Sequence, residues 1–222
     1  MNPLKILKIL VFYSDMLSDE TAFPRVARPT AGFVYLLVIT PPPGDCKRIM
    51  QLKSQLARTC ASGIALSRPH ITVAQFFAGE KNEEMIIRAI SNTAAAYKPF
   101  RIRLENYGSF PQHTVYIHVD AGAVLKNLSA DLRYAVYHLL IRGIENRRPH
   151  FLTRAHLTII RRMERGHWCS AVRICRRLSY RSAFTATGMY LLKWMPEKEA
   201  YRQIAQIPFS DRKPRPRQLP LF

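Results

Sequence analysis

Two stretches of this chain carry the same pattern of side chains able to transfer protons and to donate hydrogen bonds to anions. The first begins at Arg68 and reads RPHITV, and the second begins at Arg154 and reads RAHLTI. The chain has seven histidines, and its composition predicts only about 0.35 His-x-Thr triplets by chance. Two copies therefore indicate a functional repeat. The candidate catalytic residues are His70, Thr72, His156 and Thr158.

Both patterns are typical of β-strands, in which successive side chains point to opposite faces. Each His and the Thr two residues later then share one face. If the two strands lie side by side around a pseudo-two-fold axis, two imidazoles and two hydroxyls converge on one pocket that suits a tetrahedral anion. The same alternation adds Arg68 and Arg154 to this pocket as candidate substrate-binding residues. It directs Arg161, five residues after His156, to the other face, so we rank this candidate lower.

This set of side chains fits acid–base catalysis at a tetrahedral, anionic centre. Histidine has an unperturbed pKa of about 6.5, so one imidazole can accept a proton while the other donates one. The threonine hydroxyls can donate hydrogen bonds to the oxygens of the charged intermediate, as in an oxyanion hole. No cluster of Asp or Glu accompanies either motif, which argues against a catalytic centre with two metal ions.

The segments RPHITVAQF and RAHLTIIR resemble the two signatures of the two-histidine phosphoesterase superfamily, which includes the 2'-5' RNA ligase-like proteins and the cyclic phosphodiesterases. The resemblance extends in outline over residues 32–209, through an initial apolar strand and the hairpin YGSFPQHTVYIHV. It implies a metal-independent enzyme without cofactors that acts on 2',3'-cyclic or 2'-5'-linked phosphodiesters of RNA or nucleotides. The second motif departs from the family once, because Ala155 stands where proline is more common.

Two other functions stay open at this point. One is an RNA-binding module without catalysis, in which Tyr35 or Tyr116 would offer a stacking surface for bases. Tyr35 is therefore a further candidate substrate-binding residue, although a pure binder has no need of both His and both Thr. The other is the joining of RNA ends in 2'-5' linkage by the reverse reaction. The sequence has no Walker-type loop or nucleotide-activating lysine motif, which disfavours ATP-driven ligation.

The charge of the chain favours a polyanionic partner. The sequence has 34 Lys and Arg against 15 Asp and Glu, which gives a formal net charge of +19. The excess is uneven, because residues 142–181 contain eleven arginines and two acidic residues. We therefore expect RNA or a nucleotide phosphodiester as the ligand.

The cysteines and the N-terminal residues indicate the compartment. The four cysteines form no Cys-x-x-Cys pair, so we expect buried thiols in a reducing environment. His167, Cys169 and Cys175 lack a fourth ligand at a spacing that zinc would need. The apolar run 9–13 is closely flanked by charged residues and is too short for a signal sequence or a membrane span. These features predict a cytoplasmic protein without a membrane partner. We also expect a monomer.

The pattern of apolar and turn residues predicts alternating strands and helices. Strands are expected at 32–39, from the first motif to about 77, and at 101–107, 114–119, 154–161, 183–194 and 200–209. Helices are expected after Asp45, after Asn82, from 125 to 139 and near 167–179. Because motif strand, helix and hairpin recur, we predict an α+β fold with a bilobed, pseudo-two-fold duplicated arrangement. Each lobe would be an antiparallel-rich sheet flanked by helices, with the active site in the central groove.

The sequence divides into three parts. Residues 1–31 form an N-terminal extension, and residues 32–209 form the bilobed phosphoesterase domain. Within that domain the first motif lies in a lobe of about 60–120, and the second in a lobe of about 150–209. Residues 210–222 are basic and rich in proline, and we expect them to be disordered.

Overall fold

The computed structural model describes residues 32–60, 67–111, 114–142, 148–161 and 165–211. Within these residues the chain forms an α+β fold, as predicted, with one nine-stranded sheet and four α-helices. The N-terminal extension and residues 212–222 of the tail lie outside the described residues.

The two motif strands are neighbours in the centre of the sheet. The strands are β1 (Phe33–Ile39), β2 (Ile71–Ala78), β3 (Phe100–Phe110), β4 (Thr114–Asp120), β5 (His150–Phe151), β6 (His156–Arg161), β7 (Arg181–Ala186), β8 (Gly188–Met195) and β9 (Ala200–Pro208). Their order across the sheet is β7-β3-β4-β6-β2-β1-β8-β9, and β5 pairs with β2. β2 and β6 carry the two motifs and run antiparallel, with Ile71 opposite Leu157. The short strand β5 was not predicted.

Each hairpin lies beside the motif strand from the other half of the sequence. β3 and β4 follow the first motif along the chain, yet β4 pairs with the second motif strand, β6. β8 and β9 follow the second motif, yet β8 pairs with β1, which borders the first motif strand, β2. The expectation that each hairpin accompanies the motif before it therefore does not match the strand order.

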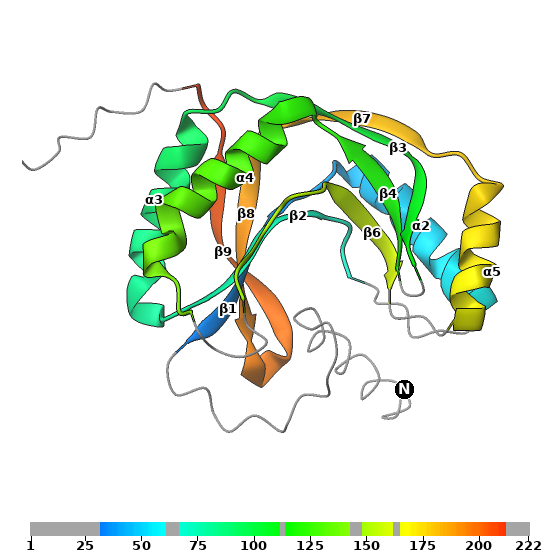
Figure 1. The fold of residues 1–222 in the computed structure, drawn as a ribbon, viewed down its shortest axis with the longest axis horizontal. Helices are drawn as coiled ribbons and strands as arrows, with labels where there is room; N and C mark the ends of the chain where they lie inside the picture. Colours follow the sequence, from blue (N-terminus) through cyan, green and yellow to red (C-terminus); the bar gives the residue numbers. More distant parts are fainter. Residues whose placement is uncertain (1–31, 61–66, 112–113, 143–147, 162–164, 212–222) are drawn as a thin grey trace, which may run out of the picture.

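The segment 183–194, which we expected to be one strand, belongs to two strands in different parts of the sheet. β7 pairs with β3, whereas β8 pairs with β1 and β9. Thr187 alone connects them, and its carbonyl accepts a hydrogen bond from the N–H of Phe209 at 2.9 Å. The rings of Phe100 and Phe209 lie 5.2 Å apart beside this crossing. The sheet is therefore curled, and strands far apart in its order meet at this point (Figure 1).

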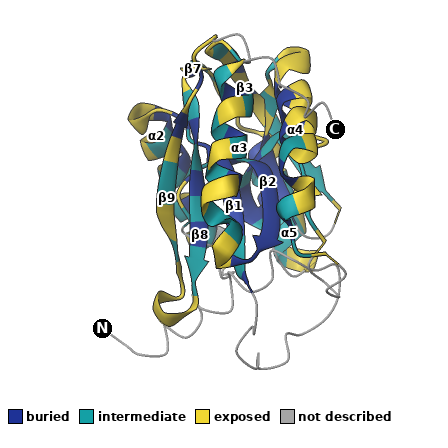
Figure 2. Cartoon of the chain, turned by 90° about the vertical axis from the view of Figure 1, so that its left-hand side faces the viewer, coloured by how far each residue is buried: buried dark blue, intermediate teal, exposed yellow. Residues whose placement is uncertain are grey.

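Four helices pack on one face of the sheet and enclose a single apolar core. They are α2 (Pro43–Cys60), α3 (Glu83–Ala95), α4 (Gly122–Val136) and α5 (Arg165–Arg176). α3 and α4 lie side by side and cover the half of the sheet with β9 and β2, whereas α2 and α5 cover β3, β4 and β6 (Figure 1). The outward sides of α3 and α4 are exposed, and the strands behind them are buried (Figure 2). No helix in the described ranges is long and apolar enough to span a membrane.

Two predicted helix starts have roles other than capping. Asn82 stands directly before α3 but makes no capping hydrogen bond, because its Nδ2 donates to the carbonyl of Leu139 at 2.9 Å. Asp45 lies in the first turn of α2 and accepts a hydrogen bond from the hydroxyl of Tyr180 at 3.2 Å. Both side chains therefore tie a helix start to a distant segment.

Candidate active site

Each motif histidine is oriented by the backbone of its own motif. His70 Nδ1 lies 2.8 Å from the carbonyl oxygen of Arg68, and His156 Nδ1 lies 3.0 Å from the carbonyl oxygen of Arg154. A carbonyl oxygen can only accept, so Nδ1 carries the hydrogen in both rings. The Nε2 atom of each imidazole is thereby left for proton exchange. The same arrangement in both motifs supports equivalent positions for the two rings.

The antiparallel register brings all four candidate catalytic side chains onto one face, which we call the site face. Because Ile71 is opposite Leu157, the residues on either side of this pair also face each other across the two strands. Each histidine then neighbours the threonine of the other motif. Ile71 and Leu157 are fully buried on the opposite face, within the core. The register therefore predicts that His70, Thr72, His156 and Thr158 converge on this face.

A β-bulge brings Arg161 to the site face, which corrects its predicted orientation. Thr158 is opposite Tyr116, but Ile160 is opposite Val115, so Ile159 is one extra residue in β6. An extra residue reverses the alternation beyond it. Arg161 is opposite Thr114, and Thr114 shares a face with Tyr116, so Arg161 points to the same side as the catalytic candidates.

The same irregularity occurs in the first motif strand. Thr72 is opposite Val38, but Ala74 is opposite Leu37, so Val73 is the extra residue in β2. Gln75 is opposite Leu36 and therefore returns to the site face. The side chain five residues after the histidine thus enters the site face in both motifs, as Gln75 in one and Arg161 in the other.

Burial and nearby positive charge disfavour protonation of the motif histidines. Burial lowers the pKa of His70 to about 4, and the charges of Lys53, Arg161 and His156 add to this effect. Burial also lowers the pKa of His156, as do the charges of Arg154 and Arg161. Arg161 is therefore near enough to act on both imidazoles. A bound anion would offset this excess of positive charge.

Lys53 contributes a buried cation behind the first motif. Its side chain is 2% exposed, and its Nζ donates a hydrogen bond to the carbonyl of Ser67 at 2.9 Å. Burial, followed by the charge of Arg161, lowers its pKa to about 8. In the described part of the chain no acidic side chain forms an ion pair with Lys53. Lys53 therefore adds a buried positive charge close to His70, whose pKa it helps to lower.

Aromatic rings form a wall beside the second histidine. The ring of His156 lies 5.3 Å from that of Phe110 and 5.4 Å from that of Tyr116, and these two rings are 4.6 Å apart. Gly108 is opposite Tyr116 in the β3–β4 hairpin. A Cβ atom at Gly108 would lie 2.6 Å from Cε2 of the tyrosine ring, so glycine is needed for this ring position.

Replacement of Gly108 by alanine should destabilise the protein by about 1–3 kcal/mol, the usual effect of overpacking. The added methyl group would push the Tyr116 ring away from Gly108 and disturb the contact with His156. Urea denaturation of Gly108→Ala, with the neighbouring Ser109→Ala as a control, measures this effect. Equal stability of Gly108→Ala and the wild type would show that the ring moves without cost.

The three arginines that we predicted to bind substrate have different positions in the structure. The charge of Arg161 lowers the pKa of both imidazoles, as described above. The guanidinium carbon of Arg154 lies 5.8 Å from the centre of the Phe110 ring, at the edge of the aromatic wall. The side chain of Arg68 is exposed. Burial raises the pKa of the Cys46 thiol on α2, and the charge of Arg68 acts in the opposite direction. For Arg68 and Arg154 the contribution visible in the structure is the backbone carbonyl, and contact of their side chains with substrate stays a prediction.

Tyr35 is not part of the site, contrary to the hypothesis from the sequence. Its side chain is 0% exposed, and its hydroxyl donates a hydrogen bond to Glu83 Oε2 at 2.8 Å. The ring stacks on Phe76 within the core, on the helix-covered face. Because β1 is apolar throughout, its sequence could not reveal which residues face the helices.

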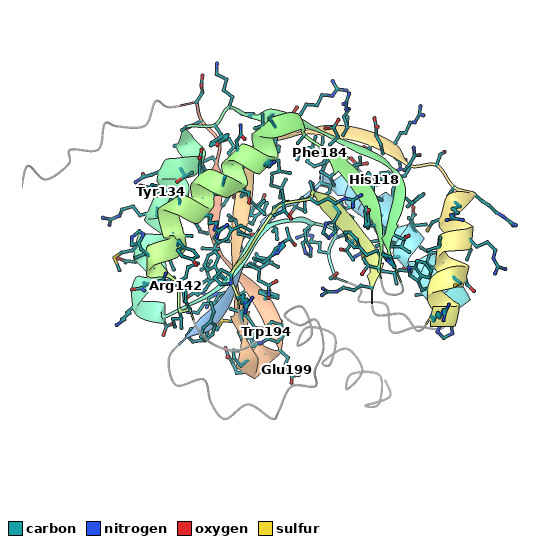
Figure 3. The ribbon with its side chains drawn as sticks, in the orientation of Figure 1. His118, Tyr134, Arg142, Phe184, Trp194 and Glu199 are labelled. Carbon is teal, nitrogen blue, oxygen red and sulfur yellow. The ribbon has the colours of Figure 1, made fainter. Side chains whose placement is uncertain are left out.

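Two further histidines that we did not single out lie near the site. His118 is opposite His156 on β4, and its ring is 5.2 Å from that of Tyr116. Figure 3 shows His118 in the half of the molecule away from Tyr134 on α4. His150 is opposite Gln75. Burial lowers the pKa of His150, and the charge of His156 lowers it further. Only the alternation in YIHV could have indicated His118, and no sequence signal marked the short strand of His150.

The described residues contain no group of three His, Cys, Asp or Glu side chains placed to hold a metal ion. Cys169 is exposed and Cys175 is buried, both on α5. The site is therefore built from imidazole, hydroxyl, amide and cationic groups.

A sheet whose two central strands present paired His and Thr side chains, each imidazole held by its own motif, defines a two-histidine phosphoesterase. Comparison with protein families agrees, because the 2'-5' RNA ligase superfamily matches residues 41–196. The chain belongs to this superfamily. A comparison with curated protein sequences gives no match.

Solved structures of low sequence identity share the fold. The protein TT0787 of Thermus thermophilus has a TM-score of 0.57 and 16% identity, over 79% of this chain and 97% of that chain. E. coli LigT complexed with 3'-AMP has a TM-score of 0.57 and 11% identity, over 80% and 98% of the two chains. LigT complexed with phosphate has a TM-score of 0.54 and 13% identity, over 82% and 99%. The described domain thus spans nearly the whole length of these proteins.

Proposed function

We propose that this protein is a metal-independent phosphodiesterase for 2',3'-cyclic or 2'-5'-linked phosphodiesters of RNA or nucleotides. The observation that carries the proposal is the paired anchoring of His70 and His156 through Nδ1, which leaves both Nε2 atoms for proton transfer. Membership of the 2'-5' RNA ligase superfamily supports it. The complexes of LigT with 3'-AMP and phosphate concern a protein of the same fold and make a nucleotide ligand reasonable here.

The mechanism assigns one proton transfer to each imidazole. One Nε2 removes a proton from the attacking water or hydroxyl, and the other imidazolium donates a proton to the leaving ribose oxygen. Hydrolysis of a cyclic substrate then breaks one P–O bond, forms one P–O bond and yields a nucleotide monoester. The low pKa of His70 keeps it neutral near neutral pH, which favours the role of base for this residue.

The other groups of the site face stabilise the charged phosphorus. Thr72 and Thr158 each stand two residues after a motif histidine and on the site face, so their hydroxyls can donate to non-bridging oxygens. Arg161 supplies a positive charge that acts on both imidazoles and would act equally on an anion between them. Because these donors are fixed by the strands, little reorganisation is needed when charge develops.

A panel of 2',3'-cyclic nucleotides and 2'-5'-linked dinucleotides, assayed in EDTA, tests the proposal. Turnover in EDTA would support metal-independent hydrolysis. Tight RNA binding without turnover of any substrate would instead support a binding module, and joining of RNA ends would support the reverse reaction. The expected cytoplasmic location and monomeric state stay predictions that this assay does not address.

The pH dependence of kcat/KM should have its maximum on the acidic side of pH 6.5. One imidazole must be protonated and the other neutral, and both pKa values are lowered, that of His70 to about 4. As pH rises, a lowered pKa means that the acid loses its proton earlier, so the rate falls sooner than for free histidine. Below about pH 4 the base becomes protonated and the rate falls again. Initial rates from pH 4 to 9 at constant ionic strength measure the profile, and a flat profile from pH 5 to 9 would contradict it.

A further inference from the structure

The side-chain amide of Gln75 is a buried hydrogen-bond donor for which no described residue provides an acceptor. Its side chain is 4% exposed, and within the described residues its Nε2 atom is buried and has no hydrogen-bond partner. A buried polar group of this kind destabilises the folded state, and buried groups in native proteins are nearly always paired. Such a donor calls for an acceptor that is supplied by another molecule.

The position of Gln75 places this donor next to the catalytic candidates. The bulge at Val73 turns it to the site face, three residues after Thr72 on the same strand. It occupies the place in the first motif that Arg161 occupies in the second. Across the strand pair it faces His150, and His150 is near enough to His156 for the charge of one to affect the other. Gln75 and His150 therefore border the site on the β5 side.

We propose that Gln75 and His150 form a subsite that binds a neutral oxygen of the substrate nucleoside, either a carbonyl of the base or a hydroxyl of the ribose. This inference rests on the proposed function. Arg161 offers a charged donor suited to phosphate, whereas the amide of Gln75 is a neutral donor, for which an uncharged oxygen is the matching acceptor. The two bulges thus place a charged donor and a neutral donor at equivalent positions of the two motif strands.

The subsite can open with a small movement. β5 is two residues long and pairs with β2 through Ala74 and Gln75. A shift of this short segment alone would therefore bring a ligand to the amide of Gln75. No rearrangement of the central strands is required.

The test replaces Gln75 with methionine, which keeps the length of the side chain and removes the amide. We expect the free protein to be as stable as the wild type or more stable, because the unpaired donor is gone. We also expect kcat/KM for a 2',3'-cyclic nucleotide to fall about tenfold or more. Gln203→Met, at an exposed position of β9, is the matched control and should change neither quantity.

Two substrates separate the possible acceptors. A loss for 2',3'-cyclic UMP but not for 2',3'-cyclic AMP assigns the contact to a base carbonyl, because uracil has carbonyl oxygens and adenine has none. An equal loss for both assigns it to the ribose. Unchanged kcat/KM for both substrates, or a loss confined to the adenosine substrate, would overturn the proposal. A clear drop in stability would also overturn it, since the amide would then be paired in the free protein.

Binding measurements keep this inference separate from the proposed function. If the wild type hydrolyses neither substrate, titration calorimetry with 3'-UMP and 3'-AMP still tests the subsite. Weaker binding to Gln75→Met than to the wild type would support the subsite even though the proposed reaction had failed. Equal binding to both proteins, or no binding to the wild type, would refute it.

Discussion

His70→Ala and His156→Ala should each lower kcat for a 2',3'-cyclic nucleotide by about 10²–10⁴-fold, the range of general acid–base catalysis. Each substitution removes one Nε2 from the pair, and the remaining imidazole cannot be both base and acid in one turnover. Because both rings are held in the same way by a carbonyl two residues earlier, we expect losses of similar size. Steady-state rates in EDTA measure the effect, and circular dichroism checks that each variant is folded.

His138→Ala is the control for this pair. His138 is exposed after α4, on the helix-covered side of the sheet, and should retain full activity. Substantial turnover by either motif variant, on a substrate that the wild type cleaves, would contradict catalysis by paired histidines. A loss in only one of the two variants would leave a single-histidine mechanism.

Arg161→Met should lower kcat/KM by a factor that corresponds to about 1.5–3 kcal/mol of lost transition-state stabilisation. This is the usual contribution of a hydrogen bond to a charged group. The variant should also move the optimum of kcat/KM to higher pH. The charge of Arg161 lowers the pKa of both His70 and His156, so its removal raises both values and keeps the acid protonated to higher pH. The two effects are measured together by pH-dependent initial rates.

Arg165→Met is the matched control for Arg161→Met, because it removes one positive charge at an exposed position at the start of α5. It should leave the pH profile with a mononucleotide substrate unchanged. Equal effects of the two variants, abolished at high salt, would show that Arg161 acts only through the general positive field of the protein. Such a result would show that Arg161 does not bind the substrate directly.

The sequence was sufficient for the elements that follow a simple period. The His-x-Thr spacing correctly predicted two strands, and Leu125, Leu128 and Leu132 correctly indicated the apolar side of α4, where all three are buried. These patterns depend only on neighbours along the chain. They are therefore visible before any long-range contact is known.

The parts that could not be predicted depend on pairing between distant strands. The orientation of Arg161 was wrong because Ile159 is an extra residue in β6, and a bulge is defined only against its partner strand. The break at Thr187 is not visible in the sequence, because residues 183–194 are mostly apolar and contain no proline, so we expected one strand there. Residues such as Gln75 thus became candidates only once the register was known.

The exchange of hairpins between the two halves of the sheet has a consequence for folding. A fragment ending after α4 would contain β3 and β4 without β6, and β1 without its neighbour β8. Neither half of the sequence can complete its own part of the sheet, so we expect the described domain to unfold as one cooperative unit. Many of its contacts join residues far apart in sequence, which predicts slow refolding. Cutting the chain between the two motifs should therefore yield two fragments that fold only when mixed.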